Sequence, residues 1–294
     1  MMFLSSIRVQ IRVAFRRREF QIAFAIACAY ACFAFIYTLL EFRNTDISLI
    51  KDANQSVCFS QFNELWFFFS LIYPFLIVLP CATSFVEDYR NRLLPAYISR
   101  TSKRIYYLSK LFACLFSTAL VIFIPFLMNI VLCNAFLPHN GNTWFGEYQM
   151  DNYCQQLLGT NIIYRTGHSG LILLKVFLTS PLLYSVCFLI IFSLFSGILA
   201  ASILGISLIF KKSIIVLFVP LFVLIRGLDV YDAYLFSQAV DTGKLYTNYR
   251  ILDYVTPTNT SGQSPAAMGF FMVITVAIIC CTTAYAIRSD ADAI

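Results

Sequence analysis

The sequence predicts an all-α integral membrane protein with six transmembrane helices, an interfacial amphipathic helix before them and large outer loops. Hydrophobic residues make up 60% of the 294 residues and charged residues only 12%, about half the charged share of a typical soluble domain. Six apolar segments approach the length of about 20 residues that a helix needs to cross a bilayer. Basic residues gather in alternate connecting segments, which is the pattern of membrane proteins.

Residues 1–19 are a basic lead-in to the first apolar segment. Between Ser5 and Glu19 apolar residues and arginines are interleaved in the run SSIRVQIRVAFRRRE. This spacing fits a helix face and also the alternation of a strand, so periodicity alone does not decide. An arginine-rich segment beside a membrane span favours a helix in the bilayer interface. A signal peptide could also start this way, but the apolar run that follows is long enough to span.

The six predicted spans form one transmembrane domain and are unequal in length. They cover residues 20–40, 65–85, 111–136, 176–210, 213–227 and 266–287. The fourth is long for one span, but no polar turn divides it, so we expect one long helix. The fifth weakens near Gly227 and is short. We expect the larger segments 137–170 and 226–265, which follow the third and fifth spans, on the outer side of the membrane.

The distribution of charge predicts that both termini and residues 84–110 are cytoplasmic. With six spans and an inner N-terminus, the inner segments hold 14 basic and 5 acidic residues, a net charge of +9. The outer segments hold the other 7 basic and 10 acidic residues, a net charge of −3. An excess of Lys and Arg on the inner side is the usual arrangement. Splitting the fourth segment would place Lys211 and Lys212 outside and weaken this asymmetry.

Residues 84–110, between the second and third spans, form a charged connector. It opens on two carboxylates, Glu87 and Asp88, and no glycine interrupts it. Its basic residues are Arg90, Arg92, Arg100, Lys103, Arg104 and Lys110. Such a surface can offer charge-assisted hydrogen bonds and stacking to an acidic, apolar groove of another protein. The alternative is that the arginines only fix topology and contact anionic lipid.

The sequence lacks the motifs of several other functional classes. There is no GxxxxGK[ST] phosphate-binding loop and no HExxH metal motif. The two histidines, His139 and His168, fall in a predicted outer segment, and we expect no metal site. No carboxylate lies at the centre of a predicted span, which counts against ion-coupled transport and intramembrane proteolysis.

Cysteines form no metal or redox motif. Eight of the ten lie in apolar runs, where cysteine behaves as a small hydrophobic residue, and no CxxC occurs. The other two, Cys58 and Cys154, fall in the predicted outer segments 41–63 and 137–170, on the oxidising side. They could form a disulfide that joins these segments, and the alternative is two free thiols.

Two sets of residues inside the spans suggest specific roles. Small residues spaced four apart on the fourth span would let another helix approach closely, either in the same subunit or in a second one. They are Ser193, Gly197, Ala201 and Gly205. Phe75 and Phe222, which lie close to helix-distorting prolines (Pro220 in the fifth span), could line an apolar substrate path. The alternative for these aromatic residues is ordinary packing at the membrane interface.

This layout resembles the ABC-2 type transporter permeases. The family pattern in the connector is an acidic residue, a Leu-Leu pair, a Ser-Arg step and a Lys. In this sequence these are Glu87, Leu93–Leu94, Ser99–Arg100 and Lys110. The glycine usual soon after the acid and the proline usual before the Ser-Arg step are both missing. The resemblance implies the membrane subunit of a bacterial ABC exporter, located in the plasma membrane with both termini cytoplasmic.

The resemblance also implies partners and residue roles. Such permeases pair with a second permease subunit, identical or related, and bind two separate P-loop ATPase subunits. ATP and Mg would be held by the ATPase, so this chain would need no cofactor and would not itself be an enzyme. The connector would form a coupling helix that contacts the ATPase through Glu87, Asp88, Arg90, Arg92, Arg100 and Arg104.

The spans carry few polar residues, which favours an amphiphilic substrate such as a hydrophobic peptide, an antibiotic or a lipid. Membrane lipid is an expected partner and nucleic acid is not. Two other classes remain open: a non-transporting accessory or immunity protein of the membrane, and a membrane enzyme. An enzyme should show titratable residues clustered near one membrane face, and an accessory protein would bind no ATPase.

Overall fold

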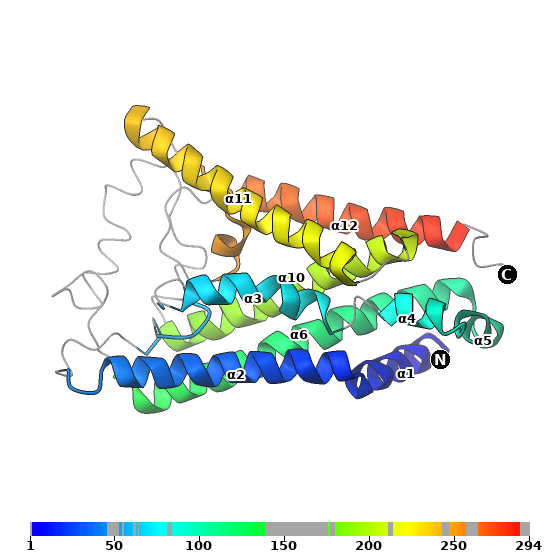
Figure 1. Ribbon diagram of the computed structural model, residues 1–294, viewed down its shortest axis with the longest axis horizontal. Coiled ribbons are helices and arrows are strands. Elements are labelled where there is room, and N and C mark those ends of the chain that lie inside the picture. The colour runs from blue at the N-terminus through cyan, green and yellow to red at the C-terminus, as the bar shows by residue number, and fades with distance from the viewer. Residues whose placement is uncertain are drawn as a thin grey trace.

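The computed structural model describes residues 2–45, 53–54, 56–60, 63, 65–80, 84–138, 176, 180–210, 214–242, 247–256 and 264–288. Its helices are α1 (Met2–Arg16), α2 (Arg18–Glu41), α3 (Trp66–Val78), α4 (Ser84–Arg90), α5 (Leu94–Arg100), α6 (Lys103–Phe136), α10 (Pro181–Phe210), α11 (Ile214–Thr242), the 3₁₀ helix η2 (Ile251–Tyr254) and α12 (Pro265–Arg288) (Figure 1). These described residues contain no β-strand. The predicted all-α class is therefore confirmed.

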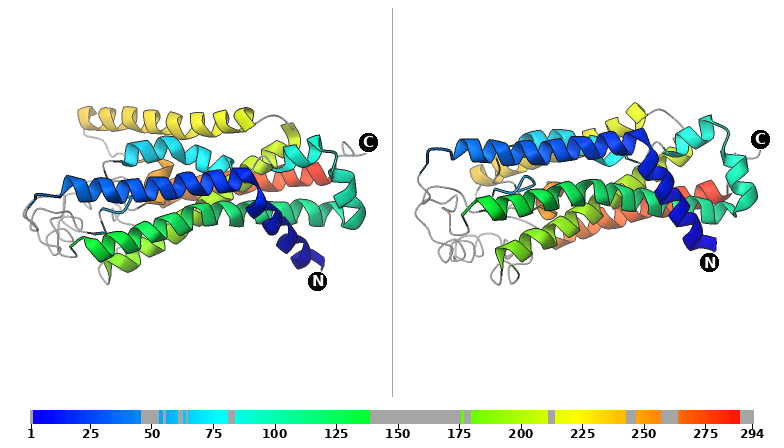
Figure 2. Two further views of the ribbon diagram at one scale, coloured as in Figure 1. Left: turned by 60° about the horizontal axis from the view of Figure 1, so that its bottom comes forward. Right: turned by 90° about the horizontal axis from the view of Figure 1, so that it is seen from below.

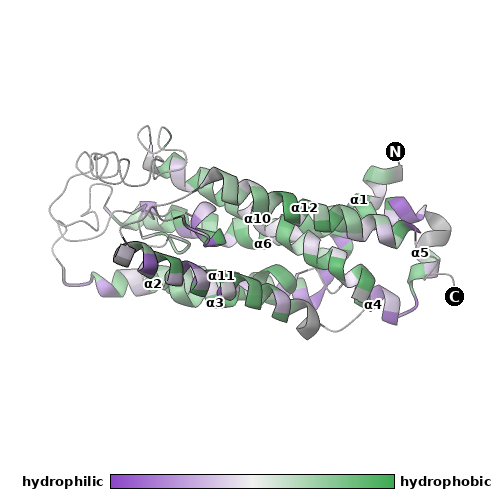
Figure 3. Cartoon of the chain, turned by 90° about the horizontal axis from the view of Figure 1, so that it is seen from above, coloured by the Kyte–Doolittle hydropathy of each residue, from purple (hydrophilic) through white to green (hydrophobic). Residues whose placement is uncertain are grey.

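Four described helices are long and apolar enough to cross a membrane: α2, α6, α10 and α12. The middle of the bundle is predominantly hydrophobic, whereas hydrophilic residues lie toward its two ends, one of which carries α4 and α5 (Figure 3). The start of α1, the α4–α5 pair and the end of α12 lie at one end of the bundle (Figure 1). The fold is thus that of a helical membrane protein with four candidate spans.

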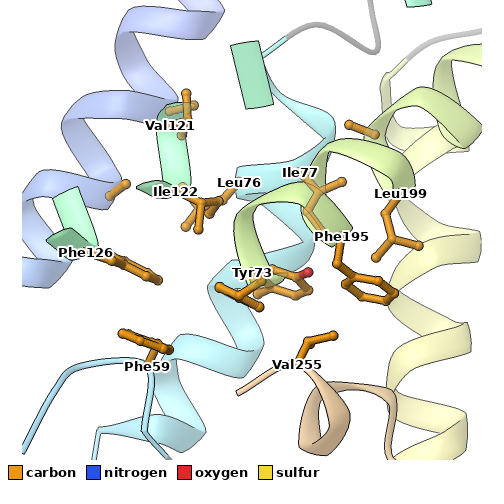
Figure 4. Packing of buried hydrophobic residues seen from close by; sticks show 14 of the residues in the cluster. Phe59, Tyr73, Leu76, Ile77, Val121, Ile122, Phe126, Phe195, Leu199 and Val255 are labelled. Carbon is orange, nitrogen blue, oxygen red and sulfur yellow. The ribbon is translucent and has the colours of Figure 1, made fainter. Parts of the chain in front are cut away.

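Helices α6 and α10 form the centre of the bundle. Helix α6 packs against α1, α2 and α10, and α10 also packs against α12 (Figures 1 and 2). Between them lies a buried cluster rich in aromatic rings, which includes Phe59, Tyr73, Phe126 and Phe195 (Figure 4). Close packing of these large side chains contributes to the contact that holds the helices together.

The N-terminal segment is helical, which settles the helix-or-strand alternative left open by its pattern. Helix α1 ends at Arg16, and Arg17 has an extended backbone (φ −71°, ψ 140°) before α2 begins. This break at Arg17 lets α1 leave the direction of α2 and cross beside the start of α6 (Figure 2). The predicted lead-in is therefore a separate helix.

The predicted second span, residues 65–85, is not one helix. Helix α3 covers only Trp66–Val78, and a separate helix, α4, begins at Ser84. Thirteen residues extend about 20 Å, less than the ~30 Å of a bilayer's hydrocarbon core. Pro80 follows the helix end, and proline cannot continue a helix because it lacks a backbone N–H.

The predicted fifth span, residues 213–227, is the first part of a longer helix. Helix α11 continues past Gly227 to Thr242, which corresponds to about 43 Å. The start of the segment expected outside the membrane is therefore helical. The predicted fourth segment is one undivided helix from Pro181 to Phe210. Its proline stands at the helix start, where a missing N–H costs nothing.

Residues 56–60 enter the bundle, although the sequence pattern placed residues 41–63 outside it. Cys58 and Phe59 are fully buried. The Tyr30 hydroxyl, near the middle of α2, donates to the Cys58 carbonyl at 2.9 Å, and the Cys58 N–H donates to Asn129 Oδ1 at 2.9 Å. The side-chain amide of Asn129 donates to the Ala31 carbonyl at 2.9 Å. Non-helical backbone at this depth is tolerated because these side chains satisfy it.

Candidate functional site

The end of the bundle that carries α4 and α5 contains a buried cluster of charged residues. Asp88 on α4 is its centre, and its side chain is 7% exposed. Asp88 Oδ2 accepts hydrogen bonds from the Lys110 ammonium and, at 2.7 Å, from the Tyr106 hydroxyl. Lys110 Nζ also donates to the Ser84 carbonyl at 3.0 Å. The cluster therefore joins α4 to the first turns of α6.

Arg17 joins this cluster from the junction of α1 and α2. Its Nη1 donates to Glu87 Oε2 at 2.6 Å and its Nη2 donates to Asp88 Oδ1 at 3.2 Å. A guanidinium presents several N–H donors in a fixed plane, which suits a bridge between two carboxylates. Because Arg17 lies between two helices, it connects both of them to α4.

The charges of the cluster balance, with two cations (Arg17, Lys110) and two carboxylates (Glu87, Asp88). Burial raises the pKa of Glu87, and the nearby Arg17 guanidinium lowers it in part. Taking charged groups out of water is costly, and removing one member of a buried pair leaves the other uncompensated. The cluster therefore depends on all its members being present together.

Helices α4 and α5 are joined by a tight turn at Arg92. The backbone of Arg92 has a φ of 54°, the left-handed region that favours glycine. The N–H of Leu93 donates to the Asp88 carbonyl at 3.0 Å, and the N–H of Arg92 donates to the Tyr89 carbonyl at 3.2 Å. This pair of bonds is the Schellman arrangement that ends many helices. The turn projects the two short helices from the bundle end as one unit (Figure 1).

The six residues predicted to couple to a partner fall into two groups. Asp88 is buried and Glu87 is half-buried, both inside the charged cluster. Arg90 ends α4, Arg92 lies in the α4–α5 turn and Arg104 lies at the start of α6, and all three are exposed. Arg100 is the last residue of α5, and its side chain lies outside the described part of the structure. The three exposed arginines are therefore accessible to a second protein, while Asp88 and Glu87 hold α4 in place through their ion pairs.

The predicted path residues lie on two facing helices. The ring of Phe75 on α3 stacks on Phe218 of α11 with centroids 3.9 Å apart, and Phe218 contacts Phe222 at 5.6 Å. Phe75 is 50% exposed and Pro220 is exposed. These residues thus form an aromatic strip on the outside of this single chain. Sequence reasoning missed Phe218, which connects the two predicted residues.

The small residues of α10 lie where α10 approaches its neighbours. A Cβ atom on Gly197 would stand 2.6 Å from the carbonyl oxygen of Leu115 on α6, and one on Gly205 would collide with Thr282 of α12. Ser193 and Ala201, one turn before and after Gly197, are buried. Both glycines therefore serve close helix contacts within this chain.

Several polar contacts were not predicted from the sequence. Arg226 Nη2 on α11 donates to Ser70 Oγ on α3 at 2.7 Å and pairs with Asp229 at 3.0 Å. Asp232 is buried, and it accepts the Tyr249 N–H at 2.7 Å. Charged residues at the end of an apolar run were the available signal for Arg226 and Asp229. Nothing in the sequence distinguishes Arg17 from the two arginines beside it.

The remaining predicted residues are only partly described. Cys58 is buried and its thiol is free, which is the alternative that the sequence analysis left open for it. Cys154 lies outside the described residues. His139 and His168 also lie outside them. Within the described ranges, no group of three or more His, Cys, Asp or Glu residues is placed to hold a metal ion.

Comparison of the chain with protein-family models, with curated proteins and with solved structures found no match.

Proposed function

We propose that this chain is the membrane-spanning permease subunit of an ATP-driven exporter of the ABC-2 type. The observation that carries the proposal is an exposed basic surface at the α4–α5 end of the bundle (Arg90 on α4, Arg92 in the turn, Arg104 at the start of α6), with α4 anchored by the ion pairs of Asp88 with Lys110 and Arg17. A subunit moved by a separate ATPase needs a contact surface that is firmly tied to its spans. The α4–α5 end of the bundle offers an accessible surface, and the ion pairs of Asp88 tie it to α6 and to the α1–α2 junction.

The contacts also provide a route for transmitting motion. A displacement of α4 would act on α6 through the Asp88–Lys110 pair and on the α1–α2 junction through Arg17. Helix α6 packs along α2 and α10, so the displacement would reach the centre of the bundle. Close-packed helices shift as rigid elements, because their interfaces do not deform continuously.

The proposed assembly contains two permease subunits, identical or related, and two P-loop ATPase subunits that hold ATP and Mg. It lies in the bacterial plasma membrane, with the α4–α5 end in the cytoplasm. Both ends of the described chain lie at this same end of the bundle (Figure 1), which agrees with both termini being cytoplasmic. The proposed cargo is an amphiphilic molecule such as a hydrophobic peptide, antibiotic or lipid.

The aromatic strip of Phe75, Phe218 and Phe222 is the proposed boundary of the substrate path. Phe75 is exposed and Phe218 and Phe222 are half-buried on this chain, which leaves the outer side of the strip available to face a second permease subunit. Large apolar rings at such a boundary can close a path without leaving water inside it. The cargo would then pass between subunits and not through the packed interior of one chain.

The test is affinity purification of the tagged chain from its native membranes, followed by identification of co-purifying P-loop ATPases and a measurement of ATP-dependent export. The double variant Arg90→Glu with Arg104→Glu should lose the ATPase and lose export. The matched control is Arg43→Glu, which reverses an exposed arginine just after α2 at the opposite end of the bundle. If the unmodified chain recovers no P-loop ATPase, the proposal fails and an accessory protein or an enzyme becomes the better explanation.

A further inference from the structure

Helix α1 has one face packed against the bundle. Gln10 and Ala14 are buried, Ser6 Oγ donates to Ser109 Oγ of α6 at 2.9 Å, and Phe3 meets Phe112 of α6 edge-on with centroids 6.0 Å apart. These contacts fix the rotation of α1 about its own axis. The other faces of the helix therefore point in defined directions away from α6.

The face opposite these contacts is a row of arginines. Arg8, Arg12 and Arg16 are spaced four apart and all three are exposed. Residues at this spacing lie above one another on a helix. The helix itself contains no Asp or Glu, and within the ranges that the structure describes no carboxylate forms an ion pair with these three arginines. The row is an uncompensated strip of positive charge.

An apolar flank runs beside the arginine row. Leu4 is 72% exposed, and Ile11 and Phe15 are half-buried. Successive helix residues are about 100° apart, so these three share one side of α1, between the arginines and the face packed on α6. A helix with adjacent apolar and cationic faces is suited to lie at a membrane surface, with its arginines at the level of the headgroups.

The position of α1 fits this orientation. At Arg17 the chain leaves α1 and enters α2, one of the four candidate spans, and α1 lies obliquely to α2 (Figure 2). A span must have its end near the bilayer surface, so α1 lies beside that surface. We propose that Arg8, Arg12 and Arg16 form a binding site for the phosphate groups of anionic phospholipids at the α4–α5 end of the bundle.

The structure favours lipid as the occupant, because the arginines share their helix with the apolar flank and adjoin a candidate membrane span. A free anion would use the charge alone and leave the flank in water. The site also has a consequence for the charged cluster, because Arg17 directly follows the arginine row. Lipid bound along α1 holds the helix in the position from which Arg17 reaches Glu87 and Asp88.

Native mass spectrometry of the full chain in detergent tests the proposal, because it counts bound phosphatidylglycerol and phosphatidylcholine directly. The unmodified protein should retain phosphatidylglycerol in preference to phosphatidylcholine. The triple variant Arg8→Gln, Arg12→Gln, Arg16→Gln should lose this preference, with affinity falling about fivefold for each arginine removed. Neither ATP nor an ATPase is involved, so failure here is separate from failure of the proposed export function.

Two further variants and competition by inorganic phosphate complete the test. Replacing the same three arginines with lysine preserves the charge and should preserve the preference, whether or not the glutamine variant folds well. Replacing Arg43, an exposed arginine just after α2 at the opposite end of the bundle, with glutamine removes exposed charge elsewhere and should leave the preference intact. Equal loss in this control, no preference in the unmodified protein, or full displacement of the lipid by inorganic phosphate would each overturn the proposal.

Discussion

Asp88 on α4 and Lys110 on α6 form an ion pair inside the bundle, with side chains only 7% and 3% exposed. They are 22 residues apart in the chain, and both lie in the segment that the sequence presents as a continuous charged connector. Because of this pair, the connector has two parts: α4, which is held against the bundle, and the exposed turn that follows it. Part of the charge in this connector therefore serves attachment within the chain.

Removing the cation of this pair should destabilise the protein strongly. Lys110→Met leaves Asp88 buried with Arg17 as its remaining cation, and breaking a buried pair in this way typically costs about 3–5 kcal/mol. The double variant Asp88→Asn with Lys110→Met removes both charges and should cost clearly less than the two single variants summed. Thermal unfolding in detergent of the four proteins of this cycle measures the coupling. Additive effects would show that the two side chains do not act as a pair.

Replacing Arg92 with glycine should stabilise the α4–α5 turn. Arg92 adopts a φ of 54°, and a side chain in the left-handed region costs about 1–2 kcal/mol, from which glycine's extra freedom in the unfolded chain must be subtracted. We expect a net gain of roughly 0.5–1 kcal/mol. The matched control is Asn91→Gly, because Asn91 is the neighbouring turn residue without a positive φ, and it should be neutral or destabilising. A loss of stability in Arg92→Gly would contradict the turn geometry.

The sequence was informative where apolar runs end at charges or prolines. The predicted span 20–40 corresponds to α2 (Arg18–Glu41), and 266–287 corresponds to α12 (Pro265–Arg288). It was uninformative about which charged residues pair with one another, because contacts between residues far apart in the chain determine that. The sequence contains three adjacent arginines, and only the packing of α1, α2 and α4 selects Arg17 as the half-buried one that binds Glu87 and Asp88. The expected connector pattern has a glycine soon after its acidic residue, and this sequence has none there. Arg92 nevertheless adopts the left-handed backbone conformation, which the sequence pattern did not predict.

Adding a methyl group at Gly197 should disturb the contact between α10 and α6. The new Cβ would stand 2.6 Å from the Leu115 carbonyl oxygen, a backbone atom that cannot move without shifting α6. Overpacking of this kind costs about 1–3 kcal/mol, which outweighs the gain in helix propensity from alanine. Gly227→Ala is the control, since a Cβ there meets nothing within 4 Å, and it should be neutral or stabilising. Chemical denaturation of both variants distinguishes the two outcomes, and equal effects would exclude a close helix contact at Gly197.

Replacing Asn129 with alanine should let residues 56–60 leave their buried position more often, so that the Cys58 thiol reacts faster with a reagent. Asn129 holds this segment through one bond of 2.9 Å, which it accepts from the Cys58 N–H, and its amide donates a second bond of 2.9 Å to the Ala31 carbonyl of α2. Asn129→Ala leaves the buried Cys58 N–H without this partner, at a cost of about 1–3 kcal/mol. Because opening the segment returns this N–H to other partners, the variant should expose Cys58 more often.

The measurement is the rate at which a maleimide labels Cys58, followed by mass spectrometry of the peptide that contains it. Cys58 is fully buried, so labelling should be slow in the unmodified protein and markedly faster in Asn129→Ala. Asn134→Ala is a suitable control, because Asn134 lies on the same helix and its amide bonds only the Ile130 carbonyl one turn away. Its labelling rate should stay at the unmodified level. Labelling that is equally slow in all three proteins would show that the ring contacts of Phe59 with Phe126 and Phe192 hold the segment without Asn129.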